Sequence, residues 1–318
     1  MFKPTVLVTG GNGLVGNAIR TLTWHHKDIN WEFVGRNDYD LIDFDQVIEM
    51  YRDIQPQYVI HTAARVGGIG LNLSEPADQF TDNILINTYV IDGAWANGID
   101  KLIAFGSVCA YPGALKDNLE EGLLHYGPPF PAHGAYAYAK RMVQVMCEAY
   151  NKQHGTQYCT FMPGNMFGPC DNFNLENGHV VPSLIHKAYL AKNQGTPLEV
   201  WGDGSAEREF LSAYDVASAC IKAVDCFMTD QHVPKNMNIS SRESRPIKEL
   251  VEAICQANNY YNVRYLDDKP VGQTVRRTNL RVLEEWWPER GERSFGEAVK
   301  ETVEWFNSCM NKGYPVRL

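Results

Sequence analysis

The sequence predicts an α/β fold, with a Rossmann-like doubly wound parallel sheet and a smaller C-terminal α/β domain. Apolar runs alternate with helical stretches through the first half, a pattern typical of parallel strands covered by helices on both faces. A glycine-rich turn joins the first apolar run to the first helical stretch. From about residue 164, proline, glycine and asparagine become frequent. We therefore expect one domain at 1–163, with contributions from roughly 205–240, and a second domain mainly at 164–318.

The individual elements follow from local apolar patterns. Residues 5–8 form a short apolar run, and the residues from about 14 to 24 indicate a helix. Further strands are expected at 32–34, 58–60, 102–105 and 158–161, and further helices near 44–53, 79–97 and 135–153. Open parallel sheets bind ligands at the carboxyl ends of their strands, so we expect the second domain to close over that edge and bind the substrate.

Composition excludes several classes of function. The 318 residues include 29 basic and 38 acidic side chains and no basic block, so we expect no nucleic-acid partner. There is no run of 18 apolar residues and no leader-like start, so we expect no membrane association. The eight cysteines are scattered and do not cluster with histidine, which predicts reduced thiols, a cytoplasmic location and no metal site.

The glycine-rich turn predicts a dinucleotide site. Gly10, Gly13 and Gly16 allow a tight turn and let backbone N–H groups at a helix N-terminus approach a diphosphate. A purely structural turn is the alternative interpretation. The turn lies between a predicted strand and a predicted helix, which is the context that dinucleotide binding requires.

The end of the second strand bears on which dinucleotide is bound. A chain that binds NAD usually has an acidic residue there for the ribose 2′-hydroxyl, whereas this chain has Arg36 and Asn37. A guanidinium suits the 2′-phosphate of NADP. Asp38 and Asp40 lie close by, and a solvated surface charge is the alternative role for Arg36. We expect NADPH/NADP as the cofactor.

Three side chains indicate proton and hydride chemistry. Tyr136 and Lys140 are one helical turn apart, so the ammonium can stand beside the phenol and stabilise the phenolate. Ser107 follows the strand at 102–105, where its hydroxyl can hydrogen-bond the same substrate oxygen as the tyrosine. Tyr138 faces another side of the helix and has no lysine four residues on. We expect Ser107, Tyr136 and Lys140 to be catalytic.

These residues resemble the extended short-chain dehydrogenase/reductase family. Within it, five further runs resemble the epimerase/reductases of GDP-4-keto-6-deoxy-D-mannose, at 65–69, 106–112, 168–173, 178–182 and 200–204. The resemblance implies conversion of that sugar to GDP-L-fucose, by 3,5-epimerisation and then NADPH-dependent reduction of the C4 ketone. The alternatives are a redox-neutral nucleotide-sugar 4-epimerase or 4,6-dehydratase, and a non-catalytic dinucleotide-binding sensor.

The resemblance also assigns site residues and a partner. Cys109 resembles the family's base and His179 its acid, which together would invert C3 and C5 through an enolate. The positions that would bind the GDP-sugar are Lys187, Trp201, Arg208 and Lys269. The expected NADPH-binding residues are Gly10, Gly11, Asn12, Gly13, Leu14, Val15, Gly16, Arg36, Asn37, Leu41, Ala63, Phe105, Gly106, Ser107, Lys140, Pro163, Asn165, Met166 and His179. A homodimer is implied as well, in which the helices near 80–97 and 135–153 of two subunits form a four-helix bundle.

Overall fold

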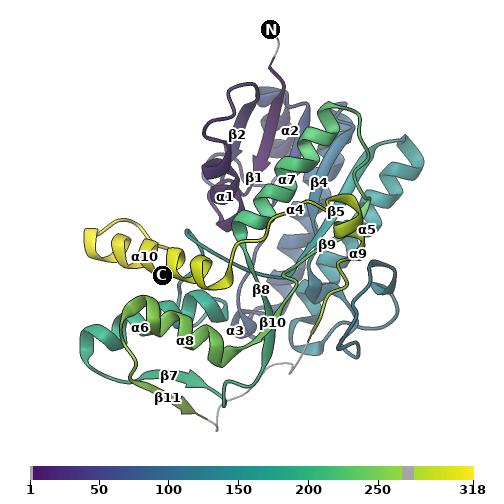
Figure 1. Cartoon of the computed structure of the whole chain (residues 1–318). Helices are drawn as coiled ribbons and strands as arrows, with labels where there is room; N and C mark the ends of the chain where they lie inside the picture. Colours follow the sequence, from purple (N-terminus) through teal and green to yellow (C-terminus); the bar gives the residue numbers. More distant parts are fainter. Residues whose placement is uncertain (1–2, 267–275) are drawn as a thin grey trace.

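The computed structural model describes residues 3–266 and 276–318, and its largest sheet has six parallel strands (Figure 1). The strand order is β2-β1-β3-β4-β5-β9. The strands are β1 (Thr5–Thr9), β2 (Asn30–Val34), β3 (Tyr58–His61), β4 (Lys101–Phe105), β5 (Gln157–Pro163) and β9 (Asn236–Ile239). Because β1 lies inside the sheet and later strands add on both sides of it, the chain is doubly wound. The predicted fold class and the five predicted strands are confirmed.

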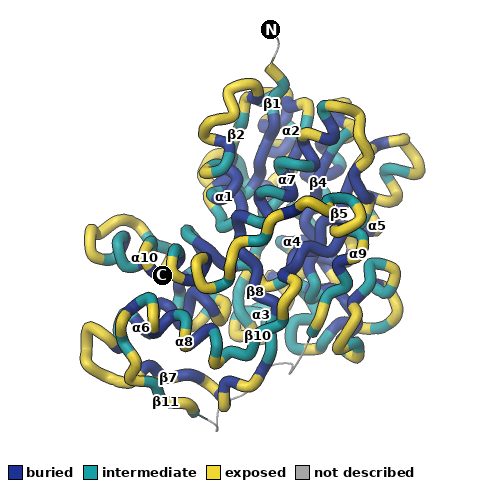
Figure 2. Tube along the Cα trace, viewed as in Figure 1, coloured by how far each residue is buried: buried dark blue, intermediate teal, exposed yellow. Residues whose placement is uncertain are grey.

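Helices cover both faces of this sheet. One face packs against α1 (Leu14–Thr23), α7 (Ala213–Met228) and α9 (Arg281–Trp286). The other packs against α2 (Phe44–Ile54), α4 (Pro76–Ala96) and α5 (Gly134–His154). Apolar side chains on both faces of the strands are buried, which explains their nearly continuous apolar runs. Buried residues are dark blue in Figure 2.

Local capping sets where several helices begin and end. The carboxylate of Asp43 accepts hydrogen bonds from the backbone N–H groups of Asp45 and Gln46, and α2 begins directly after it. Gly155, in the left-handed region at φ 75°, ends α5. The predicted helices near 44–53, 79–97 and 135–153 are confirmed to within three residues at each end.

A second, smaller core lies against the carboxyl edge of the main sheet (Figure 1). It includes a three-stranded sheet of β6 (Asn165–Phe167), β8 (Glu207–Ser212) and β10 (Ser244–Pro246), and a two-stranded sheet of β7 (Leu198–Trp201) and β11 (Val263–Leu266). Its main helices are α6 (Val180–Gln194), α8 (Ile247–Asn258) and α10 (Phe295–Lys312). The rings of Phe173 and Phe306 stack in this core with their centroids 4.5 Å apart.

The chain passes repeatedly between the two cores. Side chains from 211–239 and 280–287 pack with the main sheet, whereas those from 167–210, 247–263 and 295–310 form the smaller core. Glu209 of β8 lies at the junction, where its carboxylate accepts hydrogen bonds from Ser240 Oγ and from the backbone N–H of Thr278, both at 2.8 Å. The predicted division near residue 163 stays a prediction. No helix among the residues described is long and apolar enough to cross a membrane.

Candidate active site

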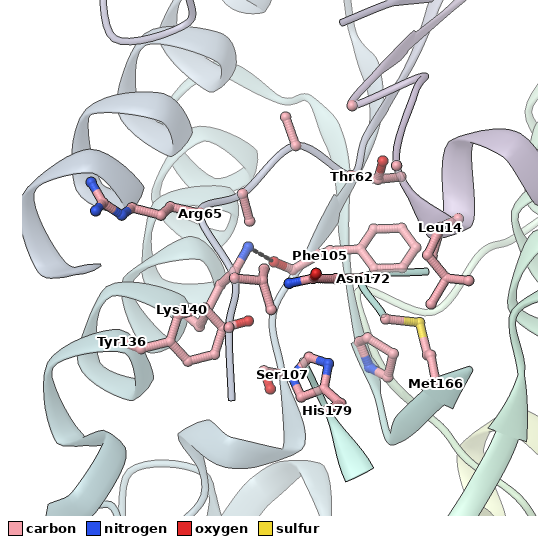
Figure 3. A pocket seen from close by; sticks show the side chains of 18 of the residues that line it. Leu14, Thr62, Arg65, Phe105, Ser107, Tyr136, Lys140, Met166, Asn172 and His179 are labelled. Atoms are coloured by element: carbon pink, nitrogen blue, oxygen red, sulfur yellow. Dashed lines mark hydrogen bonds between the residues drawn. The ribbon is translucent and has the colours of Figure 1, made fainter. Parts of the chain in front are cut away.

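A cavity of about 900 Å³ opens at the carboxyl ends of β1, β3, β4 and β5, where the smaller core meets the main sheet. Its wall is formed by the turn after β1, the segment 62–69 after β3, residues 105–109 after β4, the start of α5 and the segment 163–181. Figure 3 shows side chains from these separate parts of the chain around one space. The topology therefore assembles a site that no single segment contains.

The glycine turn forms the floor where α1 begins. Gly13 precedes α1 and offers no side chain to cap it, so the first N–H groups of this helix remain available to a ligand at the cavity wall. Gly10 has φ +71°, and a Cβ there would lie 2.8 Å from the backbone nitrogen of Ala63. This close approach and the uncapped N-terminus fit a diphosphate, which is the part of NADPH that we expected here.

Gly11 and Gly16 allow close packing of the turn and do not line the cavity. A Cβ on Gly11 would meet Phe33 Cβ at 2.7 Å, and a Cβ on Gly16 would meet the carbonyl oxygen of Gly10 at 2.5 Å. These two glycines let the turn pack on β2 and on α1. We predicted both glycines as cofactor contacts, and that assignment stays a prediction; in this structure they allow the turn to pack closely.

The loop after β2 presents Arg36 at the rim of the cavity. Arg36 is exposed and makes no ion pair within the described part of the chain, and Asn37 and Leu41 lie beside it on the wall. The carboxylate of Asp38 accepts a hydrogen bond from the backbone N–H of Gly35 at 2.7 Å. The Asp38 carboxylate is hydrogen-bonded within its own loop, so the Arg36 guanidinium is available to bind an anion. This arrangement fits the 2′-phosphate of NADPH.

Tyr136 and Ser107 form a hydrogen-bonded pair on the wall. Burial raises the pKa of Tyr136, and electrostatic interaction with Cys109 raises it further, whereas its hydrogen bond with Ser107 lowers it. Ser107 follows β4, and its Oγ also accepts a hydrogen bond from the backbone N–H of Cys109 at 3.1 Å. These groups present a neutral phenol that can donate a proton.

Lys140 is held at the end of β4. It is 2% exposed, and its Nζ donates a hydrogen bond to the carbonyl oxygen of Phe105 at 2.9 Å (Figure 3). Burial lowers the pKa of Lys140 to about 8. Lys140 is not among the groups that shift the pKa of Tyr136, and burial of the phenol is the largest influence on that pKa.

Cys109 and His179 both reach the cavity. Cys109 belongs to a short 3-10 helix, η1 (Val108–Ala110). Burial lowers the pKa of Arg208 and of Arg276, and electrostatic interaction with Cys109 raises both. His179 immediately precedes α6 and is open to the cavity, but the protein around it and the charge of Arg317 lower its pKa. Thiol, imidazole and phenol therefore share one cavity wall.

Comparisons with known proteins agree with this geometry. Residues 6–240 match the NAD dependent epimerase/dehydratase family. The chain is 33% identical over 307 residues to the GDP-L-fucose synthase of Dictyostelium discoideum, covering 96% of this chain and 95% of that protein. It is 32% identical over 315 residues to the GDP-L-fucose synthase of Escherichia coli (strain K12), covering 96% and 97%. The chain belongs to the GDP-L-fucose synthase family. The crystal structure of a GDP-L-fucose synthetase from Naegleria fowleri bound to NADP superposes with a TM-score of 0.90 at 32% identity, covering 99% of this chain and 95% of that one.

Most of the expected site residues of this GDP-L-fucose synthase family member lie on one cavity. All five expected catalytic residues line it. So do the expected cofactor-binding residues other than Gly11 and Gly16, namely Gly10, Asn12, Gly13, Leu14, Val15, Arg36, Asn37, Leu41, Ala63, Phe105, Gly106, Ser107, Lys140, Pro163, Asn165, Met166 and His179. Their exact ligand contacts stay predictions.

The expected substrate-binding residues lie apart from this wall. Lys187 of α6 and Trp201 of β7 face each other, with Nζ 5.0 Å from the indole centroid. Arg208 is connected to the cavity through its electrostatic interaction with Cys109. Lys269 lies outside the described residues. Lys187, Trp201 and Arg208 do not line the cavity, and their role in binding the GDP-sugar stays a prediction.

Sequence reasoning missed several residues of the wall. Asp171 is buried, and burial raises its pKa to about 7. Arg317 also lines the cavity, and its carbonyl oxygen accepts a hydrogen bond from the backbone N–H of Phe173 at 2.8 Å. His133 lies on the wall three residues before Tyr136. Asp171 falls in a run that we had singled out, at 168–173, but no local spacing distinguishes Arg317 or His133 from other residues of their type.

Proposed function

We propose that this chain converts GDP-4-keto-6-deoxy-D-mannose into GDP-L-fucose, by inverting C3 and C5 and then reducing the C4 ketone with NADPH. The observation that carries the proposal is the shared wall of Cys109, Tyr136 and His179 in a chain that is similar over nearly its whole length to GDP-L-fucose synthases. A redox-neutral 4-epimerase has no need for a cysteine and a histidine in addition to the tyrosine.

In this mechanism the C4 ketone acidifies the protons on C3 and C5. Cys109, as a thiolate, takes the proton from one face of the sugar and leaves an enolate. His179, as an imidazolium, returns a proton to the opposite face of the same carbon, which inverts it. Exchange with solvent restores both groups before the second inversion.

Reduction then uses the pair at the end of β4. Ser107 and Tyr136 orient the C4 oxygen, and the phenol of Tyr136 donates its proton to that oxygen. NADPH, when bound, supplies the hydride to C4. Lys140 supports the site by holding the Phe105 carbonyl beside it. The uncapped start of α1 and Arg36 are suited to hold the diphosphate and the 2′-phosphate.

The nucleotide end and the assembly state belong to the same proposal. Lys187, Trp201 and Arg208 would bind the GDP portion, because cations suit a diphosphate and an indole face suits a guanine. Exposed apolar side chains on α4 and α5, among them Phe80 and Val145, would be buried in a homodimer. All eight cysteines are free thiols, which fits a reducing compartment such as the cytoplasm.

The test follows NADPH oxidation with GDP-4-keto-6-deoxy-D-mannose and, in deuterated water, the appearance of deuterium at C3 and C5. We expect Cys109→Ser to slow deuterium incorporation while NADPH affinity is retained, and we expect His179→Gln to slow deuterium incorporation as well. Cys170→Ser is the matched control, because its thiol is also half-buried but lies off the cavity wall. Full turnover by both variants would refute the assignment of proton transfer, and NADPH-independent turnover by the wild type would favour a redox-neutral enzyme.

A further inference from the structure

The turn directly before His179 is built around one side chain. Oδ1 of Asn174 accepts hydrogen bonds from the backbone N–H groups of Glu176 and Asn177, at 2.9 Å and 2.7 Å. The carbonyl oxygen of Asn174 accepts a third hydrogen bond, from the N–H of Gly178 at 3.0 Å. Asn174 therefore binds the backbone of all three residues that lead into His179.

Close packing fixes the shape of this turn. A Cβ on Gly178 would meet the carbonyl oxygen of Asn174 and would lie 2.7 Å from that of Asn172. Glycine permits this approach because it has no side chain. The N–H of Asn174 also donates to Oδ1 of Asn172 at 3.2 Å, and Asn172 lies on the cavity wall. Residues 172–178 thus form one compact turn that begins at the wall.

The turn is attached to the segment that follows β3. The carbonyl oxygen of Asn177 accepts a hydrogen bond from the N–H of Gly68 at 2.8 Å. A Cβ on Gly68 would lie 2.7 Å from the carbonyl oxygen of Gly178, so the two segments are in close contact. Nδ2 of Asn72 donates to the carbonyl oxygen of Gly68 at 2.9 Å and holds that segment in place. The backbone before His179 is therefore tied to the main-sheet side of the cavity.

The imidazole of His179 depends on this backbone for its position. The ring reaches the cavity, where Figure 3 shows it among the side chains of the site, but it makes no hydrogen bond within the described part of the chain. The carbonyl oxygen of His179 accepts a hydrogen bond from the N–H of Ser183 of α6 at 3.0 Å. The turn on one side and α6 on the other thus locate the ring.

We propose that Asn174 is a positioning residue that holds His179 in place for proton transfer to the sugar. This inference rests on the proposed function, in which His179 returns a proton to the inverted carbons. Asn174 itself lies off the cavity wall, so it acts through the backbone and not by contact with the sugar. A displacement of about 1 Å at a reacting group can slow a catalytic step by about a hundredfold. Loss of the Asn174 side chain should therefore slow inversion.

Inversion of C3 and C5 measures the proton transfer directly. With NADP in place of NADPH no hydride is available, so NMR of GDP-4-keto-6-deoxy-D-mannose follows inversion without reduction. We expect Asn174→Ala to slow inversion by at least about tenfold. Asn174→Asp should keep most of the rate, because a carboxylate oxygen accepts the same two N–H bonds. Gly178→Ala, which displaces the same turn without removing this side chain, should slow inversion similarly.

Asn151→Ala is the matched control for a loss of stability. Oδ1 of Asn151 also accepts two hydrogen bonds, from Thr156 Oγ1 at 2.8 Å and from the N–H of Tyr158 at 2.7 Å, and Asn151 lies outside the cavity wall. Urea unfolding gives the folded fraction of each variant, and inversion rates are compared per folded molecule. Asn151→Ala should invert the sugar at the wild-type rate.

A double-mutant cycle with His179→Gln separates positioning from a general defect. Water can return the proton when the imidazole is absent, so we expect a slow residual rate in His179→Gln. Since Asn174 acts through His179, adding Asn174→Ala should leave that residual rate unchanged. A further tenfold loss in the double variant, equal losses in Asn174→Ala and Asn174→Asp, or wild-type inversion in Asn174→Ala would overturn the positioning role and leave the proposed function standing. Wild-type inversion in His179→Gln would overturn both.

Discussion

Replacing Lys140 with methionine tests how much the fold disfavours a buried ammonium. Lys140 is 2% exposed, and burial lowers its pKa from 10.5 to about 8. That difference corresponds to about 3 kcal/mol by which the fold disfavours the charged form. Below pH 8 the folded chain must carry the buried ammonium, so the full cost applies. Between pH 8 and 10.5 folded Lys140 is neutral while the unfolded chain still binds the proton, so stability rises with pH.

Lys140→Met removes this titration and keeps the volume of the side chain. We expect the free energy of unfolding of the wild type, relative to the variant, to rise by about 2 kcal/mol from pH 7 to pH 10. Urea unfolding followed by tryptophan fluorescence measures both proteins at both pH values. The variant should also lose NADPH oxidation, so that its stability and its activity change in opposite directions at neutral pH.

The control is Lys152→Met, which changes an exposed lysine on the same helix. Its stability relative to the wild type should show no comparable dependence on pH. A difference between wild type and Lys140→Met that stays constant from pH 7 to pH 10 would mean that Lys140 is not held as a destabilised ammonium. The proposed environment of the catalytic helix would then be wrong.

Three further substitutions test other parts of the site. Tyr136→Phe should reduce NADPH oxidation at least roughly a hundredfold while deuterium still enters C3 and C5 by NMR; loss of both would indicate a wider defect. Gly10→Ala should weaken NADPH binding at least about tenfold in a fluorescence titration, because its Cβ would lie 2.8 Å from the Ala63 nitrogen at φ +71°. Arg36→Ala should weaken NADPH binding about tenfold and leave NADH binding unchanged. Equal effects on the two cofactors would remove the 2′-phosphate role.

The main sheet was predictable from sequence where its strands are apolar, and not elsewhere. The strand β9 has the sequence Asn-Met-Asn-Ile, which does not resemble a buried strand. Its Asn238 is nevertheless fully buried, because the side chain donates to the Leu119 carbonyl at 2.7 Å and accepts from Tyr111 at 2.7 Å. These partners lie more than 100 residues away in the chain, and no local pattern reports them.

Local sequence patterns also predict only part of the candidate site. Tyr136, Lys140 and Ser107 could be found because each has a local context, either a helical spacing or the end of a strand. The direction of the shift in the Tyr136 pKa could not be predicted from sequence, because it depends mainly on how deeply the phenol is buried. Asn174 was missed because what distinguishes it is a set of hydrogen bonds to the turn before His179, which exists only in the folded chain.

The repeated passage of the chain between the two cores restricts how this enzyme can be recombined. A fragment ending at residue 163 would lack β9, which pairs with β5, and α7, which covers α1 and one face of the sheet. A chimera intended to graft a new sugar specificity must therefore keep residues 213–239 and 281–287 with the parent sheet. Only the segments of the smaller core, which lie before, between and after these two ranges, would be exchanged. The exchangeable unit is a set of discontinuous insertions, and crossover points chosen by position in the gene alone would divide both hydrophobic interiors.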